Sequence, residues 1–239
     1  MLMKAFIISL VNNHDATVAT RMVIESIKKT KSEIEPIILP ATIPSTIQDD
    51  IDTLGMTGID WTYPVRPEQD GLDMKTGLKL THYPTANPAN RMACMVSHMR
   101  CWQKAIDLDE TIVVLEHDAL FTRQFKFSDL TEGFKGGIIG LNNPIGATRR
   151  AHIFDGQVKK IFGLQSVPWV DDYNVPQGLA GNSAYVVSPK GAKKLLDKVK
   201  EVGMWPNDAL MCKQMFPWLQ VVYPYYTTIQ KGLKSTTTS

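Results

Sequence analysis

Short runs of consecutive apolar residues punctuate this chain, and they are separated by polar segments or by segments with helical spacing. The clearest run is Ile112 to Leu115, four β-favouring apolar residues in a row. An unbroken run predicts a strand that is buried on both faces, because a half-exposed strand would alternate apolar and polar side chains. Similar runs predict strands over residues 5–11, 36–39, 136–141, 179–187 and 219–223.

Helical spacing of apolar residues, preceded by a capping residue, predicts helices between these strands. We expect one helix from Asp15 to about Thr30, with Val18 and Met22, and also Ile24 and Ile27, as candidates for its inward side. The best-defined start is an Asn-Pro pair, because asparagine caps a helix and proline is tolerated at the first helical position. Further helices are expected over residues 45–54, 87–108, 188–199 and from 205 toward 216.

Two segments fall outside this alternation. Residues 55–87 are broken by prolines and glycines, which predicts a long loop that covers part of the site. Residues 152–162 predict a β-hairpin with an Asp-Gly turn. Elsewhere strands and helices alternate, which predicts an α/β fold with a mainly parallel sheet. We expect a single domain over residues 1–230 and a short polar tail over residues 231–239.

Glu116, His117 and Asp118 follow the buried strand directly. Ligands in open α/β sheets bind beyond the carboxyl ends of the strands, so these side chains lie where a site is expected. If the chain is still extended there, Glu116 and Asp118 point to the same side. Two carboxylates suit Mg²⁺ or Mn²⁺, which commonly complete their coordination with substrate phosphate oxygens. The alternative is that they are solvated acids at a strand end.

The helix expected over residues 87–108 carries a methionine-rich stripe that belongs to the core and a neighbouring row with polar chemistry. This row contains Arg91, Cys94 and His98, whose spacing places them on one face. Arginine and histidine beside a buried face are placed to look into a cleft. A single histidine on a buried helix is more often structural than catalytic, and this alternative stays open for His98 and its neighbour Ser97.

Composition adds few constraints. The 239 residues carry a formal net charge of +2, which gives no strong argument for a nucleic-acid or membrane surface. No run approaches the roughly 18 apolar residues that cross a bilayer, and the first ten residues lack a signal-peptide cleavage site. The 3 cysteines fit free thiols in a reducing compartment. We therefore expect a cytoplasmic protein without stable membrane insertion.

Several separated motifs line up with one known family. In chain order they are FIISL (6–10), ACMVSHMRCW (93–102), VLEHDA (114–119), GNSAYVVS with GAKKLL (181–196) and PND (206–208). Together they resemble glycosyltransferase family 25, the group of lipooligosaccharide biosynthesis transferases and collagen galactosyltransferases. The family's counterparts are an I-N-L strand, a helix with a Ser-His pair, E-D-D-A, a G-x-x-A-Y strand with its following helix, and a late P-x-D segment.

The resemblance implies a GT-A-like fold, which is a Rossmann-type mixed, mainly parallel sheet flanked by helices. It also implies an inverting transferase that moves a hexose from UDP-galactose or UDP-glucose, with Mn²⁺ or Mg²⁺ held by Glu116 and Asp118. Inversion demands a general base, for which Asp208 is the first candidate and Asp172, with its neighbour Asp171, the second. The alternative for Asp208 is a helix-capping role. The implied donor-binding residues are Ser9, Leu10, Ser97, His98, Glu116 and His117.

Three departures from the family pattern indicate a divergent member. His117 stands in place of the middle acidic residue, so the site either binds its cation more weakly or uses His117 as a ligand. Ser9 replaces an asparagine. Asn12-Asn13-His14 stands where acidic and arginine residues are frequent, which affects contacts to the nucleotide.

The acceptor is open at this level, among a glycan or lipooligosaccharide, a protein hydroxylysine and a hydroxymethylated base of viral DNA. A DNA acceptor would need a basic track beside the site. The scattered candidates for such a track are Arg149, Arg150, Lys159, Lys160, Lys193, Lys194, Lys231 and Lys234. Two other classes remain as alternatives: a catalytically inactive nucleotide-sugar-binding protein, and a phosphate-ester hydrolase, which more often shows a second cluster of metal ligands.

Overall fold

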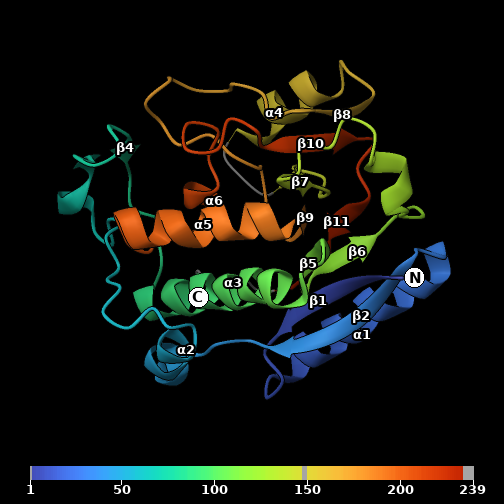
Figure 1. Cartoon of the computed structure of the whole chain (residues 1–239), viewed down its shortest axis with the longest axis horizontal. Helices are drawn as coiled ribbons and strands as arrows, with labels where there is room; N and C mark the ends of the chain where they lie inside the picture. Colours follow the sequence, from blue (N-terminus) through green and yellow to red (C-terminus); the bar gives the residue numbers. More distant parts are fainter. Residues whose placement is uncertain (1, 147–149, 234–239) are drawn as a thin grey trace.

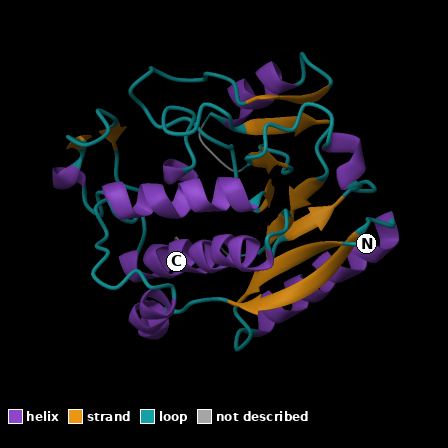
Figure 2. Ribbon diagram, viewed as in Figure 1, coloured by secondary structure: helices purple, strands orange, loops and turns teal. Residues whose placement is uncertain are grey.

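The computed structural model describes residues 2–146 and 150–233, and a central sheet with helices on both faces dominates it (Figures 1 and 2). The central sheet contains β1 (Met3–Ser9), β2 (Ile34–Pro40), β5 (Ile112–Glu116), β7 (Ile138–Gly140), β8 (Gly163–Ser166), β9 (Ala184–Val187) and β10 (Gln220–Tyr223). Two small sheets pair β3 (Gly71–Leu72) with β4 (Lys79–Leu80), and β6 (Ala119–Phe121) with β11 (Thr227–Ile229). The α-helices are α1 (His14–Thr30), α2 (Ile47–Thr53), α3 (Pro88–Leu108), α4 (Ala151–Val158), α5 (Pro189–Val202) and α6 (Asn207–Leu210). Three short 3-10 helices are η1 (Pro44–Thr46), η2 (Pro67–Gln69) and η3 (Phe127–Leu130).

The sheet is mixed, as expected. Its strand order is β2-β1-β5-β9-β7-β10-β8. β2, β1 and β5 pair in parallel, β9 runs antiparallel to both β5 and β7, β10 is parallel to β7, and β8 is antiparallel to β10. β1, β2, β5, β7 and β10 therefore run in one direction, and β8 and β9 run in the other.

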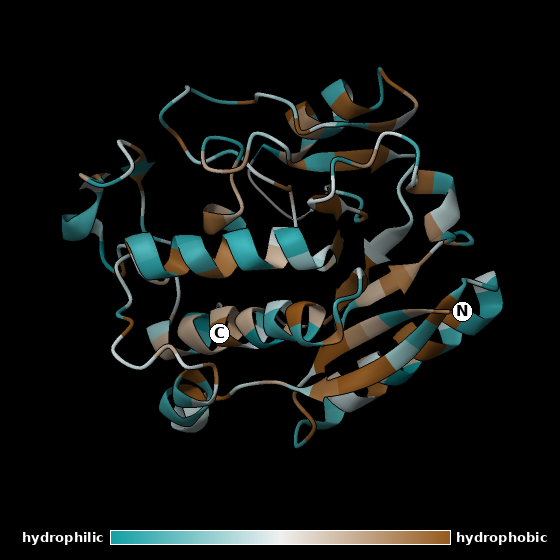
Figure 3. Ribbon diagram, viewed as in Figure 1, coloured by the Kyte–Doolittle hydropathy of each residue, from teal (hydrophilic) through white to brown (hydrophobic). Residues whose placement is uncertain are grey.

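β5 is buried on both faces, which confirms the strand predicted from its unbroken apolar run. Ile112 and Val114 belong to the core that includes residues of α3 and α5. Val113 and Leu115 belong to the core that includes residues of α1. Successive side chains of a strand point to opposite faces, so one strand supplies both cores. In Figure 1, α3 and α5 run side by side, and in Figure 3 α5 shows both hydrophilic and hydrophobic bands.

α3 begins and ends where its sequence predicts. The Asn87 side chain accepts a hydrogen bond from the backbone N–H of Ala89, and Pro88 is the first helical residue. The helix ends at Leu108, and Asp109 follows in the left-handed conformation with φ 49°. This helix carries the polar row that was expected to look into a cleft.

The inward face of α1 was predicted only in part, because Ile27 is buried whereas Val18 and Met22 are not. Val18 and Met22 are 41% and 44% exposed. The buried residues of α1 are Ala16, Ala19, Thr20, Val23 and Ile27. Small side chains allow a helix to lie closer to a sheet, so the alanine-containing row packs inward although both rows have helical spacing.

The predicted hairpin over residues 152–162 is instead helix α4 with the segment that follows it. Phe154 and Val158 are buried one turn apart, and their burial outweighs the turn preference of the Asp-Gly pair. Asp155 is helical, and its carboxylate pairs with Lys159 at 2.6 Å.

The structure also describes the cysteines and the lengths of the helices. Cys94, Cys101 and Cys212 are free thiols. Among the residues that the structure describes, none of the helices is long and apolar enough to cross a membrane.

Candidate active site

The strands β1 and β5 bring two predicted segments to one edge of the sheet. Ile8 pairs with Glu116 in parallel register, so Leu10 and His117 follow the ends of adjacent strands. A pocket that opens to solvent lies beyond these ends, with a cavity volume of about 90 Å³. It is lined by Ile8, Leu10, Ala41, Thr42, Ile43, Pro44, Asn90, Ala93, Cys94, Ser97, His98, Glu116 and His117.

Ser9 and Leu10 differ in what they contact. The Ser9 hydroxyl is buried and accepts a hydrogen bond from Thr20 Oγ1 of α1 at 2.7 Å. Leu10 lines the pocket, as does Ile8 on the other side of Ser9. The side chain of Ser9 therefore anchors β1 to α1, while its two neighbours line the pocket.

Ser97 holds one wall of the pocket. Its hydroxyl donates to the Ala93 carbonyl oxygen and accepts from the backbone N–H of Thr42, both at 2.9 Å. This contact ties the segment after β2 to α3. Ser97 is 1% exposed, so both of its hydrogen bonds are shielded from water.

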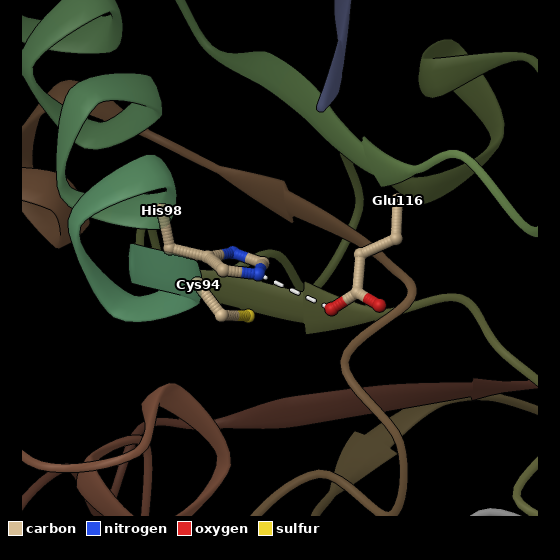
Figure 4. Close-up of side chains that lie close together, drawn as sticks. All are labelled: Cys94, His98 and Glu116. Carbon is tan, nitrogen blue, oxygen red and sulfur yellow. Dashed lines mark hydrogen bonds and ion pairs between the residues drawn. The ribbon is translucent and has the colours of Figure 1, made fainter. Parts of the chain in front are cut away.

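His98 is fully buried and connects three elements of the fold (Figure 4). Its Nε2 atom lies 3.2 Å from Glu116 Oε1 at the end of β5. Its Nδ1 atom lies 2.9 Å from the hydroxyl of Tyr185 in β9, and that hydroxyl also accepts from Trp102 Nε1 at 2.8 Å. The imidazole is thus fixed at both nitrogens. Figure 4 shows the Cys94 thiol beside it on the same face of α3.

Cys94, His98 and Glu116 form a compact group of potential ligands. One ligand atom from each lies within 4.8 Å of the others. Within the described ranges, His117 and Asp118 do not belong to this group. Burial, followed by the negative charge of Glu116, raises the pKa of the Cys94 thiol well above its usual value.

Glu116 interacts with two histidines of the site, His98 and His117. Burial tends to raise its pKa, but the hydrogen bond and charge of His98, followed by the charge of His117, outweigh burial and lower it. Burial lowers the pKa of His117 itself, against the opposing effect of Glu116. Glu116 is therefore held as a carboxylate at the mouth of the pocket.

Asp118 lies in a turn rather than in a continuation of β5. Residues 117 and 118 form a turn between β5 and β6, so the extended backbone expected between Glu116 and Asp118 is absent there. Burial and the nearby charge of Glu116 raise the pKa of Asp118 to about 7, against a lowering hydrogen bond with Ser183. Its Oδ1 atom is buried and has no hydrogen-bond partner among residues 2–146 and 150–233.

Asp208 reaches the same region from α6. Burial raises its pKa, the charge of Arg91 opposes this rise, and the charge of Glu116 adds to it. The Asp208 Oδ1 atom also accepts from the backbone N–H of Ala209 at 3.0 Å. The N-cap position of α6 is occupied by Pro206, so the helix-capping role weighed for Asp208 is wrong. The predicted loop over residues 55–87 contributes Tyr63 and Tyr83, and the charge of Asp208 helps to raise the pKa of both.

Asp172 does not line the pocket at the ends of β1 and β5. It is exposed in the segment between β8 and β9, and its carbonyl oxygen accepts from Gln177 Nε2 at 2.8 Å. Its neighbour Asp171 pairs with Arg150 at 2.8 Å.

Several basic residues proposed for a nucleic-acid track are paired with acids. Arg150 pairs with Asp171, Lys159 with Asp155 and Lys193 with Asp197. Arg149 and Lys234 lie outside the described residues.

The family model of glycosyltransferase family 25 (LPS biosynthesis protein) matches residues 3–132, which is 130 of the 239 positions. The chain belongs to this family. The match contains β1, α3, β5 and the acidic turn, so the resemblance of these segments is confirmed. The G-x-x-A-Y-like and P-x-D-like segments lie after residue 132, and their assignment stays a prediction.

Solved structures that are similar to this family 25 glycosyltransferase include other glycosyltransferases. A mutant of LgtC aligns over 98% of this chain and 89% of that chain, with 10% identity and a TM-score of 0.45. Mouse xyloside xylosyltransferase 1 in its apo form aligns over 91% and 83%, with 11% identity and a TM-score of 0.43. No curated protein matches the chain in sequence. The expected architecture, a mixed, mainly parallel sheet flanked by helices, is present.

Sequence reasoning found α3 and the end of β5 but missed three partners of the site. Tyr185 contacts His98 across 87 positions of sequence, which no local pattern can indicate. Tyr63 and Tyr83 were part of a loop without a helical or alternating pattern. For the group of Cys94, His98 and Glu116, the sequence offers one local signal. Cys94 and His98 are four residues apart, which places both on one face of α3.

Proposed function

We propose that this family 25 glycosyltransferase moves a hexose from UDP-galactose or UDP-glucose to an acceptor hydroxyl on a glycan or lipooligosaccharide, with inversion and with Mn²⁺ or Mg²⁺. The observation that carries this proposal is the state of Asp118. Its carboxyl has a buried oxygen without a hydrogen-bond partner in the described part of the chain, and a pKa raised by burial and by Glu116. A divalent cation would supply the missing partner and relieve the repulsion between the two acids.

Glu116 lines the pocket and Asp118 follows two residues later in the turn after β5, and both offer the hard oxygen ligands that such a cation prefers. When bound, the cation would neutralise the charge that develops on the departing nucleoside diphosphate. The residues of the chain supply the rest of the binding site. Leu10, Ala41 and Ile43 give one wall an apolar surface that suits the nucleoside, while Ser97 holds that wall in place.

Asp208 is our preferred general base. It is a carboxylate near Glu116 whose raised pKa brings it closer to the pH at which a base works best. Tyr63, Tyr83 and Arg91 line a small pocket with Trp61 and Pro206, the residue two positions before Asp208. The cavity volume is only about 10 Å³, so an acceptor sugar would stack against these aromatic rings from outside rather than enter between them.

Donor binding measured by thermal shift tests the proposal. UDP, UDP-galactose and UDP-glucose are each added with and without Mn²⁺, and a ligand at 100-fold excess over its Kd should stabilise the protein by about 2.7 kcal/mol. We expect the shift to require Mn²⁺ and to be lost in Asp118→Asn. Asp107→Asn, on the exposed face of α3, is the matched control and should retain it.

Two results would contradict the proposal. The first is a shift that does not depend on Mn²⁺, and the second is a shift that persists in Asp118→Asn. Mn²⁺-dependent donor binding without transfer to any glycan acceptor would instead support the inactive nucleotide-sugar-binding alternative.

A further inference from the structure

We propose that Cys94, His98 and Glu116 form a second cation site, selective for a thiophilic divalent ion of the Zn²⁺ type. This site differs in chemistry from the one proposed for Mn²⁺ or Mg²⁺, because it contains a thiol and an imidazole. Its existence does not depend on the proposed function, since it is argued from the positions of three side chains.

Local structure places the three ligands together. Cys94 and His98 are four residues apart in α3 and therefore lie on the same face one turn apart. Glu116 approaches this face from the end of β5 (Figure 4). One ligand atom from each residue lies within 4.8 Å of the others. The three ligand atoms are therefore already gathered, and an ion at their centre would draw them closer together.

The distance between the nitrogen and oxygen ligands suits a tetrahedral ion. Nitrogen and oxygen ligands about 2.05 Å from a tetrahedral Zn²⁺ would lie about 3.3 Å from each other. His98 Nε2 and Glu116 Oε1 are 3.2 Å apart. Thiolate and imidazole ligands favour Zn²⁺, whereas Mg²⁺ and Mn²⁺ prefer oxygen ligands. Three protein ligands would leave the fourth position of the ion open to water or to another ligand.

The surroundings of His98 support metal binding by Nε2. A bound ion needs the lone pair of Nε2, so the ring proton must then reside on Nδ1. Nδ1 lies 2.9 Å from the Tyr185 hydroxyl, which can accept that proton in a hydrogen bond. Trp102 Nε1 donates to the same hydroxyl at 2.8 Å and holds it in place. Such an outer hydrogen bond orients the imidazole of a metal ligand.

The site also has an entry path. Cys94, His98 and Glu116 all line the pocket at the ends of β1 and β5. An ion entering from solvent would release two protons to water, that of the Cys94 thiol and the one through which His98 Nε2 bonds to Glu116, and would form metal–sulfur and metal–nitrogen bonds. Cys101 and Cys212 are fully buried and are not part of the group, so Cys94 is the only thiol placed for this role.

Zinc binding has a consequence that does rest on the proposed function. Glu116 would be a ligand in both sites, so an ion held by Cys94 and His98 takes this carboxylate from the Mn²⁺ or Mg²⁺ site. We therefore infer that the thiophilic ion inhibits donor binding.

Co²⁺ is a direct probe of the ligand set, because a Co²⁺–thiolate bond gives intense charge-transfer absorption in the near ultraviolet. We expect the purified, chelator-treated protein to bind one Co²⁺ with this absorption, and Zn²⁺ to displace it. The absorption should disappear in Cys94→Ser and persist in Cys212→Ala. No such absorption, or the same absorption in Cys94→Ser, would overturn the site.

A measurement on the unmodified protein covers the case in which Cys94→Ser does not fold. Cys94 is half-buried, whereas Cys101 and Cys212 are buried, so a thiol reagent should modify Cys94 first. Zn²⁺ should slow this modification. A rate that does not change with Zn²⁺ would overturn the site without any variant.

The inhibitory consequence is tested separately by adding Zn²⁺ to the UDP thermal-shift measurement with Mn²⁺. One equivalent of Zn²⁺ should abolish the shift in the unmodified protein and should have a smaller effect in Cys94→Ser. A shift that survives Zn²⁺ in a protein with the Co²⁺ absorption would overturn the competition. Co²⁺ absorption in a protein without any UDP shift would leave the site intact and contradict the proposed function instead.

Discussion

Gln230 holds His117 in place through its side-chain amide, whose nitrogen donates to the His117 carbonyl oxygen at 3.1 Å. The same nitrogen donates to the Ala19 carbonyl oxygen of α1 at 2.9 Å. The backbone N–H of Gln230 donates to the Asp118 carbonyl oxygen at 2.8 Å. Gln230, which follows β11, therefore connects the turn at His117 and Asp118 to α1.

Gln230→Ala should loosen this turn. Gln230 is 8% exposed, and the change removes the donor to two carbonyl oxygens, which should lower the free energy of unfolding by about 1–3 kcal/mol. Mn²⁺-dependent UDP binding should weaken as well. Urea unfolding and a binding titration measure the two effects. Gln124→Ala is the control, because its amide bonds to the Lys31 carbonyl at the surface and its loss should change stability by less than about 0.5 kcal/mol. Equal losses in both variants would contradict this role.

The pKa of Asp118 predicts a pH dependence for the metal-free protein. Its folded value of about 7 lies above the ordinary value of 3.8, so the folded state binds more protons than the unfolded state between these values. The contribution of this group to the free energy of unfolding therefore falls as the pH rises from about 4 to about 7. Asp118→Asn should remove that decline, as measured by urea unfolding at several pH values. A slope that is the same in both proteins would show that Asp118 does not titrate there.

A related effect is expected for the cation. Mn²⁺ must replace the proton of Asp118, so Mn²⁺ affinity should increase as the pH rises toward and past about 7. Calorimetric titration at pH values below and above 7 measures this change.

Asp208→Asn should separate binding from transfer. A general base contributes roughly 10²–10⁴-fold to a rate, so transfer should fall by about that factor while Mn²⁺-dependent donor binding is retained. Asp172→Asn tests the second candidate, and its exposed position predicts little change. A large loss of transfer in Asp172→Asn, with little change in Asp208→Asn, would reverse the assignment.

Gly178 is placed so closely against the segment that carries Asp208 that a side chain would not fit. A Cβ atom at Gly178 would lie 2.0 Å from the Met211 carbonyl oxygen and 3.2 Å from that of Asp208. Gly178→Ala should therefore displace α6, lower the free energy of unfolding by about 1–3 kcal/mol and reduce transfer more than donor binding.

Gly156→Ala is the matched control for that variant. A Cβ atom at Gly156 of α4 would meet nothing within 4 Å in the described part of the chain. Because alanine favours a helix over glycine, this change should stabilise the protein by about 0.5–1 kcal/mol and leave transfer unchanged. A loss of transfer in Gly156→Ala would show that the glycine comparison does not isolate α6.

Local patterns were sufficient for the elements that carry their own signal. β5 was predicted from four consecutive apolar residues, and α3 from its Asn-Pro start and its spacing, because these features act within a few residues. α4 was mistaken for a hairpin because an Asp-Gly pair favours a turn locally, whereas the burial of Phe154 and Val158 depends on what packs against them. β11 was missed because its partner β6 is more than 100 positions away.

The site divides in the same way. Glu116 was found because a strand end is visible in the sequence, and Cys94 with His98 because helical spacing is. The turn at Asp118 was not predicted, because it is held by Gln230, which lies more than 100 positions later in the sequence. Likewise, Tyr185 reaches His98 only because β9 lies beside β5 in the sheet.

The alternation of side chains along β5 has a consequence for the position of Glu116. If β5 slipped by one residue against β1, Val113 and Val114 would exchange cores, and Glu116 would lose its place opposite Ile8. The slip is resisted by the packing of the two hydrophobic cores, one on each face of the sheet. The position of Glu116 therefore depends on apolar core residues that do not line the pocket. A conservative change among residues 112–115 can displace Glu116 without altering any pocket residue.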